Sequence, residues 1–223
     1  MRNFLKRLIY INIFIITVCF SISEFLFNNI LYSFFIVLPI FIPTILIIRK
    51  IILIKNPPII WITGLPASGK TTLAIELKNR LSRKGFIVEH LDGDKIREIF
   101  PETGFTREER NNHIKRTGFL ASILQKNGIL VIASFVSPYK ESRNFIRNIC
   151  SNFIEVYLST PIDICEKRDY KGLYAKARRG EITNFTGIND IYEIPENPEI
   201  MLDTSQLSVE ECSKIITKKI FVI

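Results

Sequence analysis

The sequence has few of the residues that build metal centres or disulfide frameworks. Among 223 residues there are two histidines and four cysteines, and Cys19, Cys150, Cys165 and Cys212 form no CxxC pair. Zinc centres and disulfide-rich folds require closely spaced cysteine and histidine ligands or paired cysteines. We therefore expect neither, and widely separated free thiols are typical of a reducing cytosol.

Acidic residues are scarce in the N-terminal quarter of the chain. The formal net charge is +8, but residues 1–55 hold six Lys and Arg against one Glu, whereas residues 56–223 hold 24 against 21. The basic excess therefore belongs mostly to the short first segment. We expect one ordinary domain with an appendage, and no nucleic-acid partner.

Two apolar runs with almost no charge fill this segment, over residues 8–27 and 30–48. A helix of roughly 20 residues, rising about 1.5 Å per residue, crosses a bilayer core of about 30 Å. The second run is long enough, and the first is long enough if Glu24 lies near a headgroup interface. Residues 1–55 are therefore predicted to form a membrane anchor of two transmembrane helices.

The charges that flank the two runs predict their orientation. They are Arg2, Lys6 and Arg7 before the first run and Arg49, Lys50 and Lys55 after the second. Because cytoplasmic flanks are enriched in Lys and Arg, we expect a multi-pass membrane protein with both termini and the following domain in the cytoplasm. A secretory signal peptide, or a single span with one interfacial helix, remains an alternative.

After Asn56 and two prolines, strand-like and helix-like segments alternate. The expected strands are residues 59–63, 86–91, 129–135, 153–158 and 200–203, and the expected helices are 70–83, 107–126, 139–150, 162–168 and 208–219. Apolar strands separated by helices are typical of a mainly parallel sheet covered on both faces. We expect residues 56–223 to form one α/β domain.

A complete phosphate-binding loop joins the first strand to the first helix, because residues 64–71 read GLPASGKT and match GxxxxGK[ST]. In such a loop the backbone N–H groups surround phosphate, Lys70 reaches the β- and γ-phosphates, and the Thr71 hydroxyl binds Mg²⁺. We therefore expect a P-loop NTPase-type three-layer fold that binds ATP and Mg²⁺. The predicted nucleotide-binding residues of the loop are Gly64, Leu65, Pro66, Ala67, Ser68, Gly69, Lys70, Thr71 and Thr72.

Other features favour a small-molecule kinase. The chain has no NKxD segment to read guanine and no LSGGQ-like signature, and a basic stretch predicts a mobile lid over residues 167–187. The second strand ends in Asp92-Gly93-Asp94, at the sheet edge where ligands bind. We assign Asp92 to Mg²⁺ with Thr71, whereas Asp94 can accept a proton or cap the next helix. Which carboxylate is the base stays open.

Six motifs in order along the chain resemble the adenylyl-sulfate kinase family over nearly all of residues 59–220. They are GLPASGKT at 64–71, DGD with Arg97 at 92–97, GFT through Arg110 at 104–110, FVSPY at 135–139, KGLY at 171–174 and NFTGI at 184–188. Members of this family transfer the γ-phosphoryl group of ATP to the ribose 3′-hydroxyl of adenosine 5′-phosphosulfate (APS). The resemblance implies the same reaction, in sulfate assimilation or activation.

The resemblance also implies roles for residues outside the P-loop. Phe105 and Phe185 correspond to the aromatics that sandwich the substrate adenine. The hydroxyl of Ser137 either becomes phosphorylated or hydrogen-bonds the substrate. The implied catalytic residues are Lys70, Asp92, Asp94 and Ser137; the implied substrate-binding residues are Arg97, Phe105, Arg110, His113, Val136, Ser137, Lys171 and Phe185; and Arg168 is implied to bind ATP.

Two positions depart from the family pattern. His113 stands where many members carry Asn, and Tyr170 stands where Pro usually precedes the lid lysine. His113 either donates a hydrogen bond to substrate or lies on a helix surface, and His90 is expected to be structural. These departures keep one alternative open, a kinase of another nucleotide-linked molecule such as a cytidine diphosphoramidate. A catalytically silent nucleotide-binding module is a further alternative, against which the intact Lys70, Thr71, Asp92 and Asp94 argue. The sequence also allows a homodimer.

Overall fold

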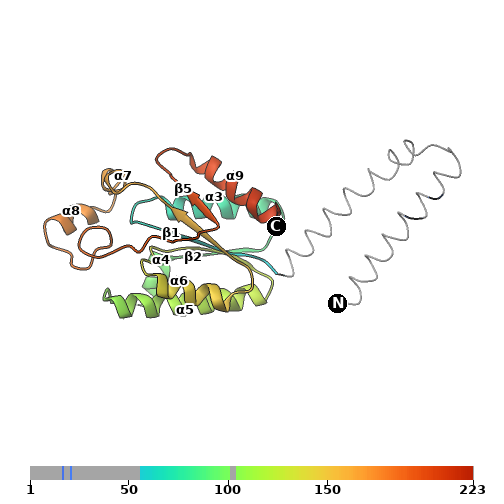
Figure 1. The fold of residues 1–223 in the computed structure, drawn as a ribbon, viewed down its shortest axis with the longest axis horizontal. Coiled ribbons are helices and arrows are strands. Elements are labelled where there is room, and N and C mark those ends of the chain that lie inside the picture. Colours follow the sequence, from blue (N-terminus) through green and yellow to red (C-terminus); the bar gives the residue numbers. More distant parts are fainter. Residues whose placement is uncertain (1–16, 18–20, 22–55, 101–103, 223) are drawn as a thin grey trace. The chain divides into compact units, whose positions relative to one another are not determined.

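The computed structural model describes residues 17, 21, 56–100 and 104–222 (Figure 1). The chain divides into two compact units, residues 1–53 and 54–223, and all elements named below belong to the second. Within the described residues, no helix is both long and apolar enough to cross a membrane. The predicted spans over 8–27 and 30–48 lie outside the described part except at Thr17 and Ser21, so they stay a prediction.

A five-stranded parallel sheet organises the second unit. The strands are β1 (Ile59–Gly64), β2 (Val88–Asp92), β3 (Leu130–Ser134), β4 (Phe153–Leu158) and β5 (Ile200–Leu202), in the order β2-β3-β1-β4-β5. Every residue of β1 and β3 is buried, as expected for central strands covered on both faces. The predicted parallel α/β fold is therefore confirmed.

Helices cover both faces of the sheet. They are α3 (Lys70–Arg83), α4 (Gly93–Ile99), α5 (Arg107–Lys126), α6 (Lys140–Ile149), α7 (Ile162–Lys167), α8 (Leu173–Arg178) and α9 (Val209–Val222). In Figure 1, α3 and α9 lie on one face, and α5 and α6 lie on the other. The sequence predicts α3 and α5 at the bounds observed, and it does not predict α4 and α8.

Side chains alternate between the two faces along each strand, and this alternation divides the core. Trp61 points toward α5 and α6, where its ring stacks on Phe135 with centroids 5.2 Å apart. Ile146 of α6 lies in the same cluster and faces Gly118 of α5, where an added Cβ would lie 2.3 Å from Ile146 Cγ1. The two helices therefore approach each other closely at Gly118.

The two edges of the sheet have different roles. At the amino edge, the start of the domain is held by Ser151 Oγ, which donates to Asn56 Oδ1 at 2.7 Å, and by Gln125 Nε2, which donates to the carbonyl of Pro57 at 2.8 Å. At the carboxyl edge, β1 leads into the P-loop and β2 ends at Asp92. The candidate site thus lies at the opposite edge from the entry of the chain.

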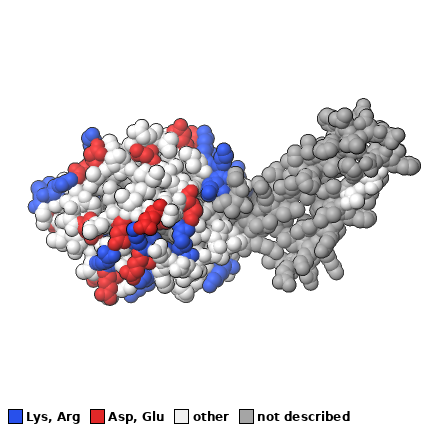
Figure 2. Space-filling view, viewed as in Figure 1, with Lys and Arg blue, Asp and Glu red and all other residues white. Residues whose placement is uncertain are grey.

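Charged side chains of both signs are interleaved on the face of the domain shown in Figure 2. Ion pairs in the domain include Lys115 with Glu141 at 2.5 Å and Arg107 with Glu193 at 2.8 Å. This arrangement agrees with the near balance of 24 basic and 21 acidic residues in 56–223.

Candidate active site

A cavity of about 860 Å³ opens at the carboxyl edge of the sheet. Its walls come from the P-loop and the start of α3, the ends of β2 and β3, α4, the first turns of α5, the segment 168–186 and the segment 204–212. The cavity brings together most of the predicted site residues: Pro66, Ala67, Gly69, Lys70, Thr71, Thr72, Asp92, Asp94, Arg97, Phe105, Arg110, His113, Val136, Ser137, Arg168, Lys171 and Phe185. Gly64, Leu65 and Ser68 are not among its lining residues and complete the loop behind it.

The P-loop has the backbone that a phosphate-binding loop requires. Gly69 precedes α3 at φ 90°, a left-handed conformation that favours glycine, and an added Cβ on Gly64 would lie 2.9 Å from the carbonyl oxygen of Leu158. Lys70 Nζ lies inside the loop and donates to the carbonyl of Leu65 at 2.6 Å. Burial lowers the pKa of Lys70 to about 8, which an anionic ligand beside the ammonium would oppose.

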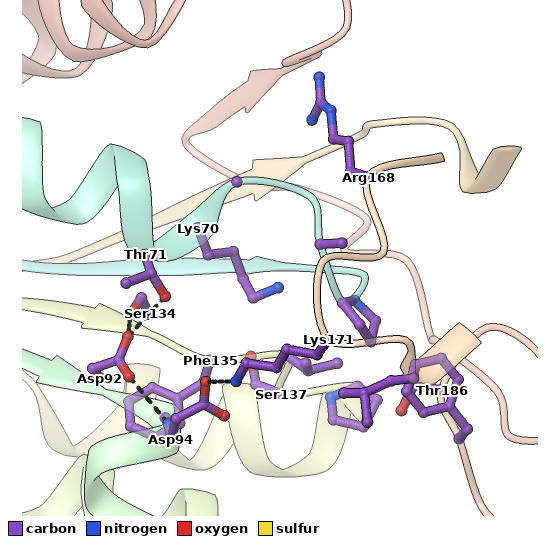
Figure 3. Close-up of a pocket in the computed structure, with 18 of the residues that line it drawn as sticks. Lys70, Thr71, Asp92, Asp94, Ser134, Phe135, Ser137, Arg168, Lys171 and Thr186 are labelled. Atoms are coloured by element: carbon purple, nitrogen blue, oxygen red, sulfur yellow. Dashed lines mark hydrogen bonds and ion pairs between the residues drawn. The ribbon is translucent and has the colours of Figure 1, made fainter. Parts of the chain in front are cut away.

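Asp92 is hydrogen-bonded at both carboxylate oxygens (Figure 3). Oδ2 accepts from Thr71 Oγ1 at 2.8 Å and from Ser134 Oγ at 3.0 Å. Oδ1 accepts from the backbone N–H groups of Asp94 and Lys95, so Asp92 caps α4. The expectation that Asp94 could be the capping residue is wrong, because Asp92 stands at the position before the first helical turn.

The electrostatics of Asp92 favour its ionised form. Burial acts to raise its pKa, but the hydrogen bonds from Thr71 and Ser134 outweigh this effect and lower the pKa below its usual value. An ionised carboxylate beside a hydroxyl offers the oxygen ligands that Mg²⁺ prefers, and Mg²⁺ is commonly held by one or two such groups together with nucleotide phosphates. In the described part of the chain, no cluster of three acidic, Cys or His side chains could hold a metal by itself. The donor set therefore fits an ion shared with a nucleotide.

Asp94 faces the cavity from the first turn of α4. Its Oδ2 accepts a hydrogen bond from Lys171 Nζ, and this bond raises the pKa of Lys171. Figure 3 shows Lys171 extending to Asp94, whereas Arg168 of the same segment points the other way. Arg168 instead donates to the side chain and the carbonyl of Thr204, both at 2.8 Å, and Thr204 Oγ1 donates to the carbonyl of Ser68.

Arg110 joins the two predicted aromatic residues. Its Nε donates to the carbonyl of Phe105 at 2.9 Å, its Nη1 donates to Thr186 Oγ1 at 2.6 Å, and its Nη2 donates to the carbonyl of Asn184. Phe105 is 57% exposed, and the guanidinium of Arg97 lies 4.6 Å from its ring centroid. Phe185 is buried at 8% exposure and lines the same cavity. In this structure Arg110 contacts protein groups on three sides and fixes both aromatic segments.

Ser137 lies in a buried hydrogen-bond network. Its Oγ accepts from Trp61 Nε1 at 3.0 Å and donates to Thr63 Oγ1 at 2.9 Å, and the residue is 1% exposed. A phosphoryl transfer to this oxygen would break the bond to Thr63. The geometry therefore favours a structural role for the hydroxyl over a covalent one.

The two histidines occupy different places in the site. His113 is buried and lines the cavity with its ring 6.1 Å from that of Phe135, so the expectation of a helix-surface histidine is wrong. Burial, aided by the charges of Arg97 and Arg116, lowers the pKa of His113 to about 4. His90 lies outside the cavity, and its Nε2 is 2.8 Å from Ser134 Oγ.

Sequence reasoning missed Ser134 and Thr204. Ser134 is paired with Asp92 across β2 and β3, and Thr204 follows β5. A serine in an apolar strand has no motif around it, and its position beside Asp92 becomes visible only once the register of the two strands is known.

Comparisons with known proteins give a consistent result. The family model for adenylylsulphate kinase matches residues 56–203. The adenylyl-sulfate kinase of Halothermothrix orenii is 50% identical over 159 residues, which cover 70% of this chain and 86% of that relative. The probable adenylyl-sulfate kinase of Aeropyrum pernix is 50% identical over 162 residues, covering 70% and 88%. The structure of the Mycobacterium tuberculosis APS kinase CysC in complex with AMPPNP and APS has a TM-score of 0.71 at 37% identity, covering 73% of this chain and 96% of that one.

Proposed function

This chain belongs to the adenylylsulphate kinase family, and we propose from this how its cavity performs the reaction. The protein is an ATP-dependent kinase that transfers the γ-phosphoryl group of ATP to the 3′-hydroxyl of APS. The observation that carries the proposal is the meeting of a complete P-loop, the Thr71–Asp92 pair and Asp94 in one cavity. ATP then occupies the P-loop side, and APS occupies the side of Phe105.

On the ATP side, the P-loop N–H groups and the Lys70 ammonium compensate the charge of the phosphates. Thr71 and Asp92 would hold Mg²⁺, which when bound neutralises further phosphate charge. Because Asp92 Oδ2 already accepts two hydrogen bonds, we propose that Asp92 acts on the ion through water and through the Thr71 hydroxyl. Arg168 is hydrogen-bonded to Thr204, which in turn donates to the carbonyl of Ser68 in the P-loop, so we place Arg168 next to the bound nucleotide.

We assign the general base to Asp94. Both oxygens of Asp92 accept two hydrogen bonds each, and its pKa is lowered, so it is a poor proton acceptor. Asp94 is 65% exposed at its side chain and is bound by Lys171. As the 3′-oxygen attacks the γ-phosphorus and the bond to the ADP oxygen breaks, the hydroxyl proton passes to the Asp94 carboxylate.

On the acceptor side, Phe105 and Phe185 present aromatic faces for the adenine of APS. Arg97 supplies a guanidinium that binds the phosphosulfate oxygens. The Lys171 ammonium lies close enough to Asp94 to contact the phosphoryl group while it is transferred. Arg110 positions Phe105 and Phe185 through its hydrogen bonds. His113 and Val136 line the part of the cavity that would hold APS. The Ser137 hydroxyl stabilises the segment that follows β3.

A turnover assay with ATP and Mg²⁺ tests this proposal, with APS, 5′-AMP and a cytidine diphosphoramidate compared as acceptors. Selective turnover of APS is expected. Turnover with only another acceptor would favour the alternative substrate, and nucleotide binding without transfer to any acceptor would favour the silent module.

Two matched variants test the assignment of the base. Asp94→Asn is expected to lower kcat by about 10²-fold or more while the affinity for Mg²⁺·ATP stays within about twofold, since a general base commonly contributes that much. Asp92→Asn is expected to weaken Mg²⁺·ATP binding instead. The reverse pattern would give the role of base to Asp92.

We also propose that residues 1–55 anchor the kinase in a membrane as a two-span hairpin, on the cytoplasmic side. The support is the composition of residues 8–27 and 30–48 and the basic residues that flank them.

A further inference from the structure

His90 is connected to the candidate active site although it does not line the cavity. In β2, His90 and Asp92 are two residues apart and so point to the same face of the sheet, toward α3. The neighbouring strand places Ser134 directly beside Asp92 in the parallel register. His90 Nε2 lies 2.8 Å from Ser134 Oγ, and Ser134 Oγ lies 3.0 Å from Asp92 Oδ2.

The direction of these hydrogen bonds is fixed by the carboxylate. An ionised carboxylate only accepts, so the hydroxyls of Ser134 and Thr71 both give their protons to Asp92 Oδ2. The Ser134 oxygen then accepts, and His90 Nε2 must be the donor. This direction is the same for the neutral Nε2–H imidazole and for the imidazolium.

The chain of bonds has a consequence at Thr71. Because the Thr71 proton points to Asp92, the lone pairs of its oxygen are left to face the P-loop side, where a metal ion would need them. The orientation of Asp92 therefore decides the orientation of the Thr71 hydroxyl. The backbone N–H groups of Asp94 and Lys95 hold the Oδ1 atom of Asp92, whereas the hydroxyls of Ser134 and Thr71 hold its Oδ2 atom.

We propose that His90 is a positioning residue that acts through Ser134 to fix the Asp92 carboxylate, and through it the Thr71 hydroxyl, for a metal-bound nucleotide. The proposal rests on the proposed function for the identity of that nucleotide. The competing interpretation is that His90 is an ordinary core side chain, since its side chain is only 10% exposed. The two differ in whether the effect of His90 depends on Ser134.

The test is a double-mutant cycle on the full chain in detergent, with His90→Leu, Ser134→Ala and the double variant. The readout is the Kd of ADP measured by calorimetry with Mg²⁺ and, separately, with EDTA. His90→Leu and Ser134→Ala are each expected to weaken ADP binding with Mg²⁺ by about fivefold, as for one neutral hydrogen bond, and to leave the Kd in EDTA within about twofold. In the Ser134→Ala background, His90→Leu is expected to have no further effect.

Two further variants act as controls. His90→Gln places an amide donor near the position of Nε2 and is expected to restore the wild-type Kd. Ser122→Ala removes another buried serine hydroxyl, which donates to the carbonyl of Phe119 in α5, and is expected to leave both Kd values unchanged.

A spectroscopic readout needs no metal. The chain has two histidines, so ¹⁵N-labelled histidine gives two imidazole spin systems. The His90 system is expected to show a protonated Nε2 whose resonance shifts in Ser134→Ala.

Additive effects in the cycle, equal losses with Mg²⁺ and EDTA, or a His90 ring without a proton on Nε2 would each overturn the proposal. If the His90→Leu variant does not fold, the Ser134→Ala variant is sufficient by itself: an unchanged Kd of ADP in the presence of Mg²⁺ would overturn the proposal. A wild-type protein that binds Mg²⁺·ADP but does not turn over APS would instead contradict the proposed function, and the cycle would still be measurable.

Discussion

His113 is a buried imidazole in the wall of the cavity, close to Phe135 and near the charge of Arg97. Burial, aided by the charges of Arg97 and Arg116, lowers its pKa and leaves a neutral ring at pH 7. A neutral imidazole can donate one hydrogen bond and accept another, as an amide can. His113 therefore offers chemistry similar to the Asn that many family members carry, in a side chain that stays uncharged.

The stability of the protein is expected to depend on His113 between pH 4 and 6.5. Because burial lowers the folded-state pKa to about 4 from 6.5, the unfolded state binds more protons in this window, and stability rises with pH up to the unfolded pKa. One such group gives a slope of up to about 1.4 kcal/mol per pH unit. Urea unfolding, followed by fluorescence of the buried Trp61, should show a smaller slope for His113→Asn. Equal slopes in the two proteins would contradict the lowered pKa.

Single residues differ in how far the sequence predicts their roles. The meeting of Lys70, Thr71, Asp92 and Asp94 in one cavity was predictable because each belongs to a contiguous motif at the end of a strand, whereas their roles stay a prediction. The contacts of Arg110 with the carbonyls of Phe105 and Asn184 join segments far apart in the chain, and the neighbours of Ser137 come from β1. These roles depend on tertiary contacts, which spacing along the sequence does not contain.

At the scale of elements, α5 shows why long helices are predictable. Thr106 and Glu109 form a capping box at its start: Thr106 Oγ1 accepts the Glu109 N–H, and the Glu109 carboxylate accepts the Thr106 N–H. These signals are local and can be read from the sequence. In contrast, α4 begins at Gly93 and is stabilised at its start by Asp92, whose carboxylate is held by other strands and helices.

Gly118 in α5 is an element-scale test in which local and tertiary effects have opposite signs. Helix propensity alone predicts that Gly118→Ala stabilises the protein by about 1 kcal/mol. The added Cβ would lie 2.3 Å from Ile146 Cγ1, in a fully buried part of the α5–α6 contact. We expect a net destabilisation of about 1–3 kcal/mol, as for other overpacked cores.

Urea unfolding of Gly118→Ala checks this expectation. Asn112→Ala lies on the exposed side of the same helix and is the matched control, with an expected gain of a few tenths of a kcal/mol. A stabilised Gly118→Ala protein would show that α5 and α6 separate at little cost.

At the scale of the whole molecule, the parallel sheet places the start of the kinase domain and the cavity at opposite ends of its strands. The domain begins at the amino edge, where Asn56 is hydrogen-bonded to Ser151, and the cavity opens at the carboxyl edge. A strand of six residues, such as β1, separates these edges by about 20 Å. The chain therefore enters the domain at the end of the sheet opposite the cavity.

If residues 1–55 form the proposed membrane hairpin, attachment is expected to change the location of the enzyme and not its kinetics. The full chain should then float with liposomes and resist extraction by alkaline carbonate, because the two proposed apolar helices would bury far more surface than a peripheral contact.

Residues 54–223 should remain in solution with kcat/KM for APS within about twofold of the full chain, since the cavity residues that the structure describes lie in that unit. Carbonate extraction of the full chain would argue for an interfacial helix, and a shortened mature N-terminus would argue for a signal peptide. A large loss of kcat/KM in residues 54–223 would mean that the first 53 residues contribute to the site itself.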